Sequence, residues 1–274
     1  MLAMENKSKK IRNPFPAVGK VFKYEMISIG RKILPIYAVL LALSLVIGLF
    51  VMDNNLDFEA EGQLGILKTV IVMLTVVLFS VMGVILITIV ARRFKKSILG
   101  DEGYLNLTLP VTIGEHLWGR YLANLVMILS YALVMFLSLL LILIRGWNKA
   151  PEAIAQLLAK SAEFKLEHGF GFGYIFWHSF IHVVSFFMFI CIFIYMTESL
   201  LRLIGKHNTL VSVLTFALVF TIYHNIAQGL FKNMVVETGL GNGFFWKWGL
   251  FNLGWIVLLS LITRYILNNK LNLE

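Results

Sequence analysis

The sequence predicts an all-α membrane protein with six transmembrane helices. Apolar residues make up 59% of its 274 residues and charged residues only 14%, far from the balance of a soluble globular protein. About 20 apolar residues are needed to cross a bilayer as a helix. Six segments meet that requirement, which leaves no room for a large soluble domain. The predicted spans are roughly residues 33–51, 66–90, 117–144, 174–198, 208–226 and 246–267.

The distribution of charge predicts which side of the membrane each loop faces. The net charge is +9, and with six spans and an internal N-terminus most basic residues fall in cytoplasmic segments, as the positive-inside rule expects. The first external loop, MDNNLDFEAEGQ, has acidic residues and no Lys or Arg. Both termini are therefore expected in the cytoplasm. Anionic lipid headgroups explain the excess charge better than nucleic acid does.

Residues 1–32 are predicted to form a cytoplasmic basic leader and an interfacial helix. They include KSKKIR at 7–12 and precede the first apolar run, which is not the pattern of a cleavable signal peptide. Apolar and basic residues alternate over 14–32, as in a basic amphipathic helix on the inner membrane surface. A disordered leader fits residues 1–12 better. Pro35 is then expected in the first turn of span one, where a missing backbone donor costs little.

The remaining chain, residues 33–267, is predicted to be one six-helix domain followed by a cytoplasmic tail at 268–274. In the longest external connection, residues 151–168 are expected to form a short helix, with Pro near its start and Gly169 after its end. Residues 227–245 mix apolar residues with glycines and are expected to form an external re-entrant element, followed by tryptophans of the interface belt.

The sequence lacks recognisable motifs for nucleotide binding, for cysteine chemistry and for ion-coupled transport. The sequence has no GxxxxGK[ST] phosphate-binding loop; LIGKHN at 203–208 has His207 where Ser or Thr should hold magnesium. The only cysteine, Cys191, lies within an apolar span, which excludes an intramolecular disulfide or a thiolate cluster. Five of the spans have no ionised residue near the middle, which argues against an ion-coupled transporter and favours a pathway for an apolar or amphipathic substrate.

Three histidines and one acidic residue near the span ends are further candidates. His178 and His182 share a face of span four and His224 lies near the outer end of span five, so a pathway, proton relay or metal site is conceivable. No HExxH motif supports a metalloenzyme, and hydrogen bonding of interfacial histidines is the favoured interpretation. Glu198 is predicted either to pair with Arg202 one turn later or to transmit motion from the cytoplasmic side.

The loop between spans two and three contains GDEGYLNLTLPVT at residues 100–112. Basic residues end span two, two glycines and a proline break the chain, and Thr112 with Glu115 has the spacing of a helix capping box. The pattern predicts a turn, a short segment along the membrane surface, and re-entry. Ordinary turn chemistry of a cytoplasmic loop is the structural alternative.

The succession of RRF, GDEGYLNLTLPVT and a long apolar span resembles the permease subunits of type-2 ATP-binding cassette (ABC) exporters, especially small six-span permeases of Gram-positive bacteria. The motif covers residues 91–116, and the plan of spans extends the resemblance over the chain. It implies a coupling helix in this loop that binds a separate ATPase subunit. The residues implied in that contact are Asp101, Glu102, Gly103, Tyr104, Leu105 and Pro110, with one of the two acids touching the ATPase.

The resemblance also implies the partners and the setting. ATP and Mg would be bound by the ATPase, with no cofactor on this chain. A second permease, identical or a sister, would complete the pathway in the bacterial plasma membrane. The resemblance fixes no substrate; amphipathic molecules, antimicrobial peptides among them, are the expected cargo because five of the spans lack charges near their middle. Two other functions remain open at this point: an intramembrane enzyme centred on the three histidines, and a membrane scaffold or sensor subunit without transport.

Overall fold

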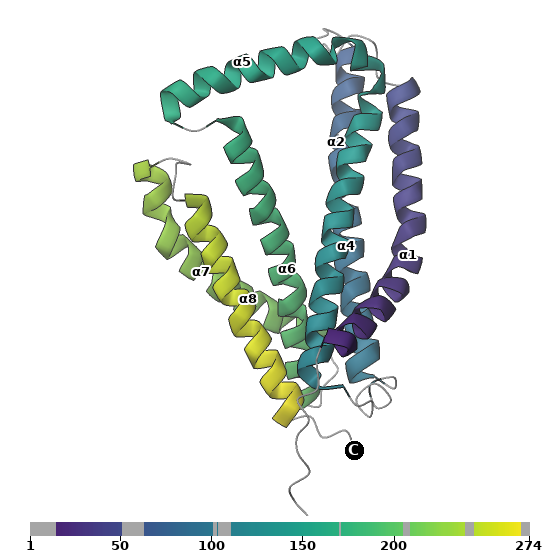
Figure 1. Ribbon diagram of the computed structural model, residues 1–274, viewed down its shortest axis with the longest axis vertical. Helices are drawn as coiled ribbons and strands as arrows, with labels where there is room; N and C mark the ends of the chain where they lie inside the picture. Colours follow the sequence, from purple (N-terminus) through teal and green to yellow (C-terminus); the bar gives the residue numbers. More distant parts are fainter. Residues whose placement is uncertain are drawn as a thin grey trace, which may run out of the picture.

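Every described element of the computed structural model is a helix (Figure 1). The structure describes residues 15–50, 63–100, 103, 111–169, 171–204, 209–238 and 244–269, and none of these lies in a strand. The elements are α1 (Phe15–Phe50), α2 (Gln63–Phe94), η1 (Lys95–Leu99), α4 (Ile113–Ile142), η2 (Ile144–Lys149), α5 (Ala150–His168), α6 (Phe172–Ile204), α7 (Thr209–Thr238) and α8 (Phe244–Asn269).

Six of the described helices, α1, α2, α4, α6, α7 and α8, are long and apolar enough to cross a membrane. In a bilayer every backbone polar group must be satisfied within the segment, which a helix does. Many large apolar side chains of these helices are exposed, among them Val84, Leu133 and Leu261, as expected of surfaces that face lipid rather than water. The chain is therefore an all-α, six-span membrane protein, as the sequence predicts.

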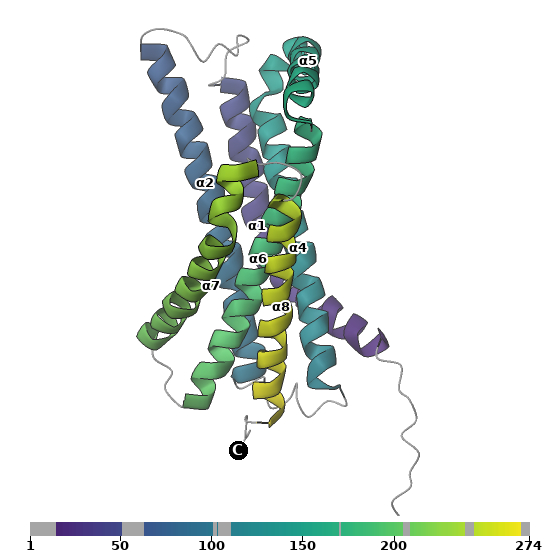
Figure 2. The same cartoon turned by 90° about the vertical axis from the view of Figure 1, so that its left-hand side faces the viewer.

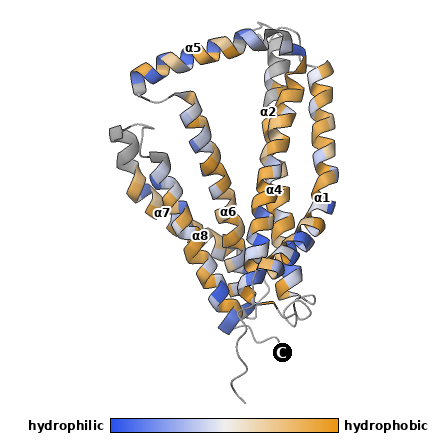
Figure 3. Cartoon of the chain, in the orientation of Figure 1, coloured by the Kyte–Doolittle hydropathy of each residue, from blue (hydrophilic) through white to orange (hydrophobic). Residues whose placement is uncertain are grey.

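The spanning helices form two groups. The helices α1, α2 and α4 make one group, in which α1 packs along α4, and α6, α7 and α8 make the other, in which α6 packs along α8. Figure 1 shows the groups converging at one end, while α5 lies across the opposite end, where Figure 2 shows it end-on. We call the converging end, where α2, α6 and α8 end and α4 begins, the basic end. Figure 3 shows hydrophilic residues concentrated there. Its described basic residues include Lys20, Lys23, Arg92, Arg93, Lys95, Lys96, Arg120, Arg202 and Arg264.

Helix α1 differs from the sequence-based expectation. Instead of a separate interfacial helix over 14–32 and a span that starts at 33, one helix runs from Phe15 to Phe50, and Pro35 lies well inside it. The physical reason is a continuous buried stripe at four-residue spacing, which includes Ile29, Ile33 and Tyr37 and packs on α4. The proline removes one backbone hydrogen bond and favours a bend, and Figure 1 shows that α1 is bent.

Two glycines allow α1 and α4 to approach closely. A Cβ atom on Gly119 of α4 would lie 2.8 Å from the Cβ of Val21 in α1, and one on Gly48 of α1 would overlap the carbonyl oxygen of Leu141 in α4. Small residues at such crossings let backbones pack tightly in a membrane, where dispersion contacts replace the hydrophobic effect. These glycines hold the first and third spans together near both ends of their contact.

The helix boundaries match some expectations and alter one. The backbone NH of Glu115 donates to Thr112 Oγ1, and the backbone NH of Thr112 donates to Glu115 Oε2, so the predicted capping box begins α4. Helix α5 occupies the segment predicted at 151–168 and is followed by Gly169, whose φ of 79° suits a helix end. Residues 227–238, expected in a re-entrant element, instead continue α7.

Candidate functional site

Three charged side chains meet in the interior of the basic end. The carboxylate of Glu25 in α1 accepts a hydrogen bond from Arg93 Nε of α2 at 3.2 Å, and Arg120 Nη2 of α4 lies 3.1 Å from its other oxygen. The side chains of Glu25 and Arg120 are only 6% and 3% exposed. We call these three residues the ion triad. It connects all three helices of the first group.

The position of each triad residue follows from local structure. Glu25 belongs to the buried stripe of α1, Arg93 lies in the last turn of α2, and Arg120 lies about two turns after the start of α4. A charge removed from water is very costly unless it is paired, and the Glu25 carboxylate pairs with both guanidinium groups. Arg120 Nε and Nη1 are buried and find no hydrogen-bond partner among the described residues.

An aromatic cluster links the triad to the second helix group. The guanidinium carbon of Arg120 lies 5.9 Å from the ring centroid of Phe94, a cation–π arrangement. Phe94 stacks on Tyr195 of α6 with ring centroids 3.9 Å apart, and Asn124 Nδ2 of α4 donates to the Tyr195 hydroxyl at 2.8 Å. Displacing the end of α2 would therefore disturb both groups of helices.

The segment that follows Arg93 is wound more loosely than an α-helix. Residues Lys95–Leu99 form the π-helix η1, in which Ser97, Ile98 and Leu99 are buried and Ser97 Oγ donates to the Arg93 carbonyl at 2.7 Å. Isolated π turns within helices occur frequently at functional sites. Here the π turn joins the ion triad to the start of the 100–112 segment.

Gly103 is the one predicted coupling residue that the structure describes. It is buried, and its backbone NH donates to the Gly100 carbonyl at 2.7 Å. A Cβ atom at this position would overlap the carbonyl oxygen of Ile98 in η1. Glycine is thus required by a close approach between two backbone segments. The other predicted coupling residues, Asp101, Glu102, Tyr104, Leu105 and Pro110, lie outside the described residues.

Glu198 has a different ion-pair partner from the predicted one. Its Oε2 lies 3.8 Å from Lys95 Nζ, at the start of η1. Arg202, the predicted partner, is exposed one turn further along α6. Because Lys95 follows α2 directly, the pair adds a second connection between α2 and α6 at the basic end.

The three histidines have separate local environments. His178 Nδ1 lies 2.7 Å from the Tyr174 carbonyl, and its ring meets Trp246 edge-on. His182 likewise meets Trp248 of α8 edge-on. His224 Nε2 lies 3.0 Å from Gln228 Nε2 within α7.

The described residues contain no group of three or more His, Cys, Asp or Glu side chains placed to hold a metal ion, so the three histidines do not gather into a centre. His178 and His224 have polar partners within their own helices, whereas His182 Nδ1 is buried and finds no hydrogen-bond partner among the described residues.

The sequence interpretation missed the ion triad. Arg93 and Arg120 were expected to be ordinary basic residues on the cytoplasmic side, and Glu25 part of a surface helix. Two signals pointed to a buried pair: Glu25 shares the four-residue spacing of Ile29 and Ile33, and Arg120 lies within an apolar span. Charges in such positions normally pair with one another.

The fold and this site together define a multi-pass, all-α membrane protein with a buried charged network at one end of the bundle. No protein-family model, curated protein or solved structure matches the chain. Any statement of its activity therefore depends on its own residues and on the resemblance of the 91–116 segment.

Proposed function

We propose that this chain is the transmembrane permease subunit of an ATP-driven ABC exporter in the bacterial plasma membrane, and that it moves an amphipathic substrate, with antimicrobial peptides as one class of cargo. The basic end faces the cytoplasm in this proposal, since Lys and Arg favour the cytoplasmic side. Both termini then lie inside the cell.

The observation that supports the proposal is the attachment of Gly103, at the start of the 100–112 segment, to the end of α2 and η1. The start of this segment is held by the contact of Gly103 with Ile98, and η1 continues directly from Arg93 of the ion triad. A partner that pushed on the segment would act on α1 and α4 through the ion triad, and on α6 through Tyr195 and Glu198. This arrangement suits a site where a partner drives relative motion of packed helices.

The energy source in this proposal is a separate ATPase subunit that binds ATP and Mg. Asp101 and Glu102 would pair with basic residues of that subunit and fix its register, as charged groups at an interface do. A second permease, either another copy of this chain or a sister chain, completes the transport pathway. The permease itself catalyses no reaction.

Copurification tests this proposal directly. The chain is coexpressed with the ATPase encoded by a neighbouring gene, and both the complex and substrate-stimulated ATP hydrolysis are measured. We expect Asp101→Ala with Glu102→Ala to abolish both. The matched control changes two exposed acids of α5, Glu152→Ala with Glu163→Ala, and should leave both unchanged.

Two results would contradict the proposal. If the loop variant keeps the complex and its stimulated hydrolysis, the acids do not have the proposed role. If the unaltered chain binds no ATPase, the permease assignment itself is wrong and a scaffold or sensor subunit becomes the better explanation.

A further inference from the structure

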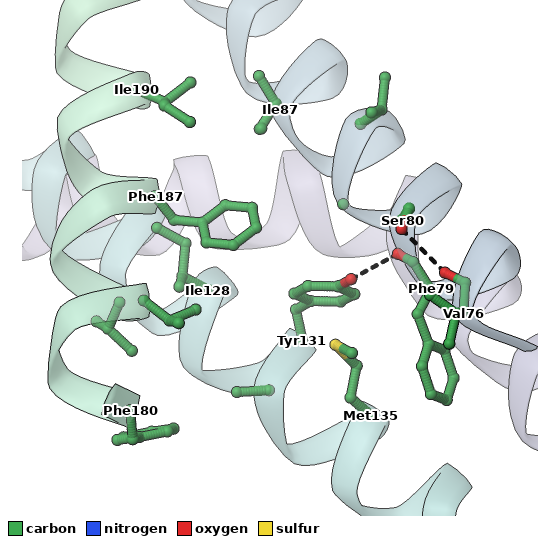
Figure 4. A pocket seen from close by; sticks show the side chains of 15 residues that line it. Val76, Phe79, Ser80, Ile87, Ile128, Tyr131, Met135, Phe180, Phe187 and Ile190 are labelled. Carbon is green, nitrogen blue, oxygen red and sulfur yellow. Dashed lines mark hydrogen bonds between the residues drawn. The ribbon is translucent and has the colours of Figure 1, made fainter. Parts of the chain in front are cut away.

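An open-sided cavity of about 560 Å³ lies between the two helix groups, near the middle of α2, α4 and α6, and its lining residue Val84 is 62% exposed. Its lining comes from residues 76–87 of α2, residues 128–135 of α4 and residues 180–190 of α6. Figure 4 shows Tyr131 and Phe187 projecting into the same region from α4 and α6. The volume is within the range of small-molecule sites, about 300–1,000 Å³.

The lining offers no free polar group to a ligand. Only two of its side chains carry a nitrogen or oxygen atom, those of Ser80 and Tyr131. The Tyr131 hydroxyl donates to the Phe79 carbonyl at 2.6 Å, and Ser80 Oγ donates to the Val76 carbonyl at 2.9 Å (Figure 4). A polar ligand would lose its hydration here without gaining hydrogen bonds, so the occupant should be apolar.

The dimensions favour a chain rather than a helix. At a rise of about 1.5 Å per residue, the lining segments of α2 and α6 are about 16 Å long. This is about half of the ~30 Å hydrocarbon core of a bilayer. Dividing the volume of about 560 Å³ by this length gives a mean cross-section of about 35 Å². An α-helix about 10 Å across needs about 80 Å², so the cavity can enclose an extended chain but not a whole helix of a second copy.

We infer that this cavity is a binding site for one acyl chain of a membrane lipid, retained as part of the folded protein. A single extended hydrocarbon chain matches the apolar lining of the cavity, its length and its narrow cross-section. It contacts α2, α4 and α6 together, so its dispersion contacts bridge the two helix groups that otherwise converge at the basic end. The inference does not depend on the proposed transport function.

A filling substitution with a matched control tests the site. Val84 of α2 is 62% exposed and lines the cavity. Val81, on the same helix, is also exposed but is not part of the lining. We expect Val84→Phe to remove phospholipid that otherwise stays bound to the full chain in mild detergent, counted by native mass spectrometry. Val81→Phe should retain as much as the unaltered protein.

Equal lipid retention in Val84→Phe and Val81→Phe, or no retained lipid in the unaltered protein, would overturn the inference. If Val84→Phe fails to fold, Ala132→Leu fills the same cavity from α4 and is measured instead.

A phospholipid with a photoreactive group in its acyl chain gives an independent measurement. Crosslinks should concentrate on the lining segments and exceed those on exposed outward positions such as Leu253. Uniform labelling would contradict a retained chain. Val84→Cys tests whether a second copy of the chain occupies the cavity instead, by measuring disulfide-linked dimers under oxidising conditions. The only native cysteine, Cys191, is buried and should not contribute a crosslink. A disulfide-linked dimer through position 84 would replace the acyl chain with a protein interface and overturn the proposal.

Discussion

The two helix groups are held together by different chemistry. At the basic end the first group, α1, α2 and α4, shares the buried carboxylate of Glu25 between two arginines. The second group, α6, α7 and α8, uses neutral partners: the Tyr223 hydroxyl donates to Asn252 Oδ1 at 2.7 Å, and Asn252 Nδ2 donates to Ser185 Oγ at 3.2 Å. Phe189 stacks on Tyr223 of this hydrogen-bonded network, and Phe251 packs against Tyr223 at a tilt.

This difference shows where each group is sensitive to change. A buried charge that loses its partner is destabilising by about 3–5 kcal/mol, whereas hydrogen bonds between membrane helices average only about 0.6 kcal/mol. The first group therefore depends strongly on one carboxylate, while the second distributes its stability over many weaker contacts. Because η1 and the 100–112 segment follow Arg93, the sensitive group is also the one next to the proposed ATPase contact.

The largest effect is expected from Glu25→Gln, which removes the negative charge that pairs with both Arg93 and Arg120. We expect a loss of about 3 kcal/mol of unfolding free energy, at the lower end of the range for broken buried ion pairs because the amide can still accept hydrogen bonds. Thermal or denaturant unfolding of the purified protein in detergent measures this loss.

A double substitution separates charge from packing at this site. Glu25→Leu with Arg120→Leu removes one charge of each sign and leaves Arg93, whose side chain is partly exposed, to reach water. Replacing a buried ion pair by apolar residues is often neutral, so the double variant should be more stable than Glu25→Gln. A double variant as unstable as the single one would contradict the electrostatic interpretation.

The next largest effect is expected from Gly119→Leu, which tests the tight contact in the first group. Its new side chain would enter the space held by Val21 and the Val18 carbonyl. Overpacking of this kind usually destabilises by about 1–3 kcal/mol. Gly254→Leu in α8 is the matched control, since a Cβ there meets nothing within 4 Å. A loss of stability in the control as large as in Gly119→Leu would remove the distinction between the two groups.

Much of the fold could be predicted from the sequence, because bilayer thickness fixes the length of each apolar run and lipid requires helices. The sequence did not predict that α1 is one continuous helix from Phe15 to Phe50. An apolar stripe over residues 17–33 fits equally well against a membrane surface or against another helix, and the spacing is the same in both cases. Only the presence of α4, with Gly119 opposite Val21, decides between them.

The candidate site was less predictable because it is assembled from distant segments. Glu25 and Arg93 are 68 residues apart in the chain, and nothing in the periodicity of either helix identifies the other as its partner. Glu198 illustrates the same limit: local helical spacing predicts Arg202, while packing of α6 beside η1 gives Lys95. The functional prediction for residues 100–112 came from a resemblance, and Gly103 alone of those coupling residues is described.

A smaller effect is expected from Asn252→Ala, which removes the uncharged side chain that hydrogen-bonds both Tyr223 and Ser185 in the second group. The substitution leaves the Tyr223 hydroxyl and Ser185 Oγ without their shared partner, which should destabilise by about 1–2 kcal/mol. Asn225→Ala on α7 is the control, because Asn225 is exposed. Unfolding in detergent measures both variants. A loss above that of Glu25→Gln would show that the second group, not the first, limits stability.

The smallest effect is expected from Glu198→Gln, which removes the charge paired with Lys95 between the two groups. The Lys95 side chain is 51% exposed and its Nζ lies 3.8 Å from the carboxylate, so water can solvate the ammonium after the change. Partly exposed ion pairs contribute about 0–1 kcal/mol. The same unfolding measurement as for Glu25→Gln compares the two acids under equal conditions. We expect Glu25→Gln to lose more unfolding free energy than Glu198→Gln because Arg120 is buried whereas Lys95 is half exposed. Equal losses in the two variants would contradict this explanation.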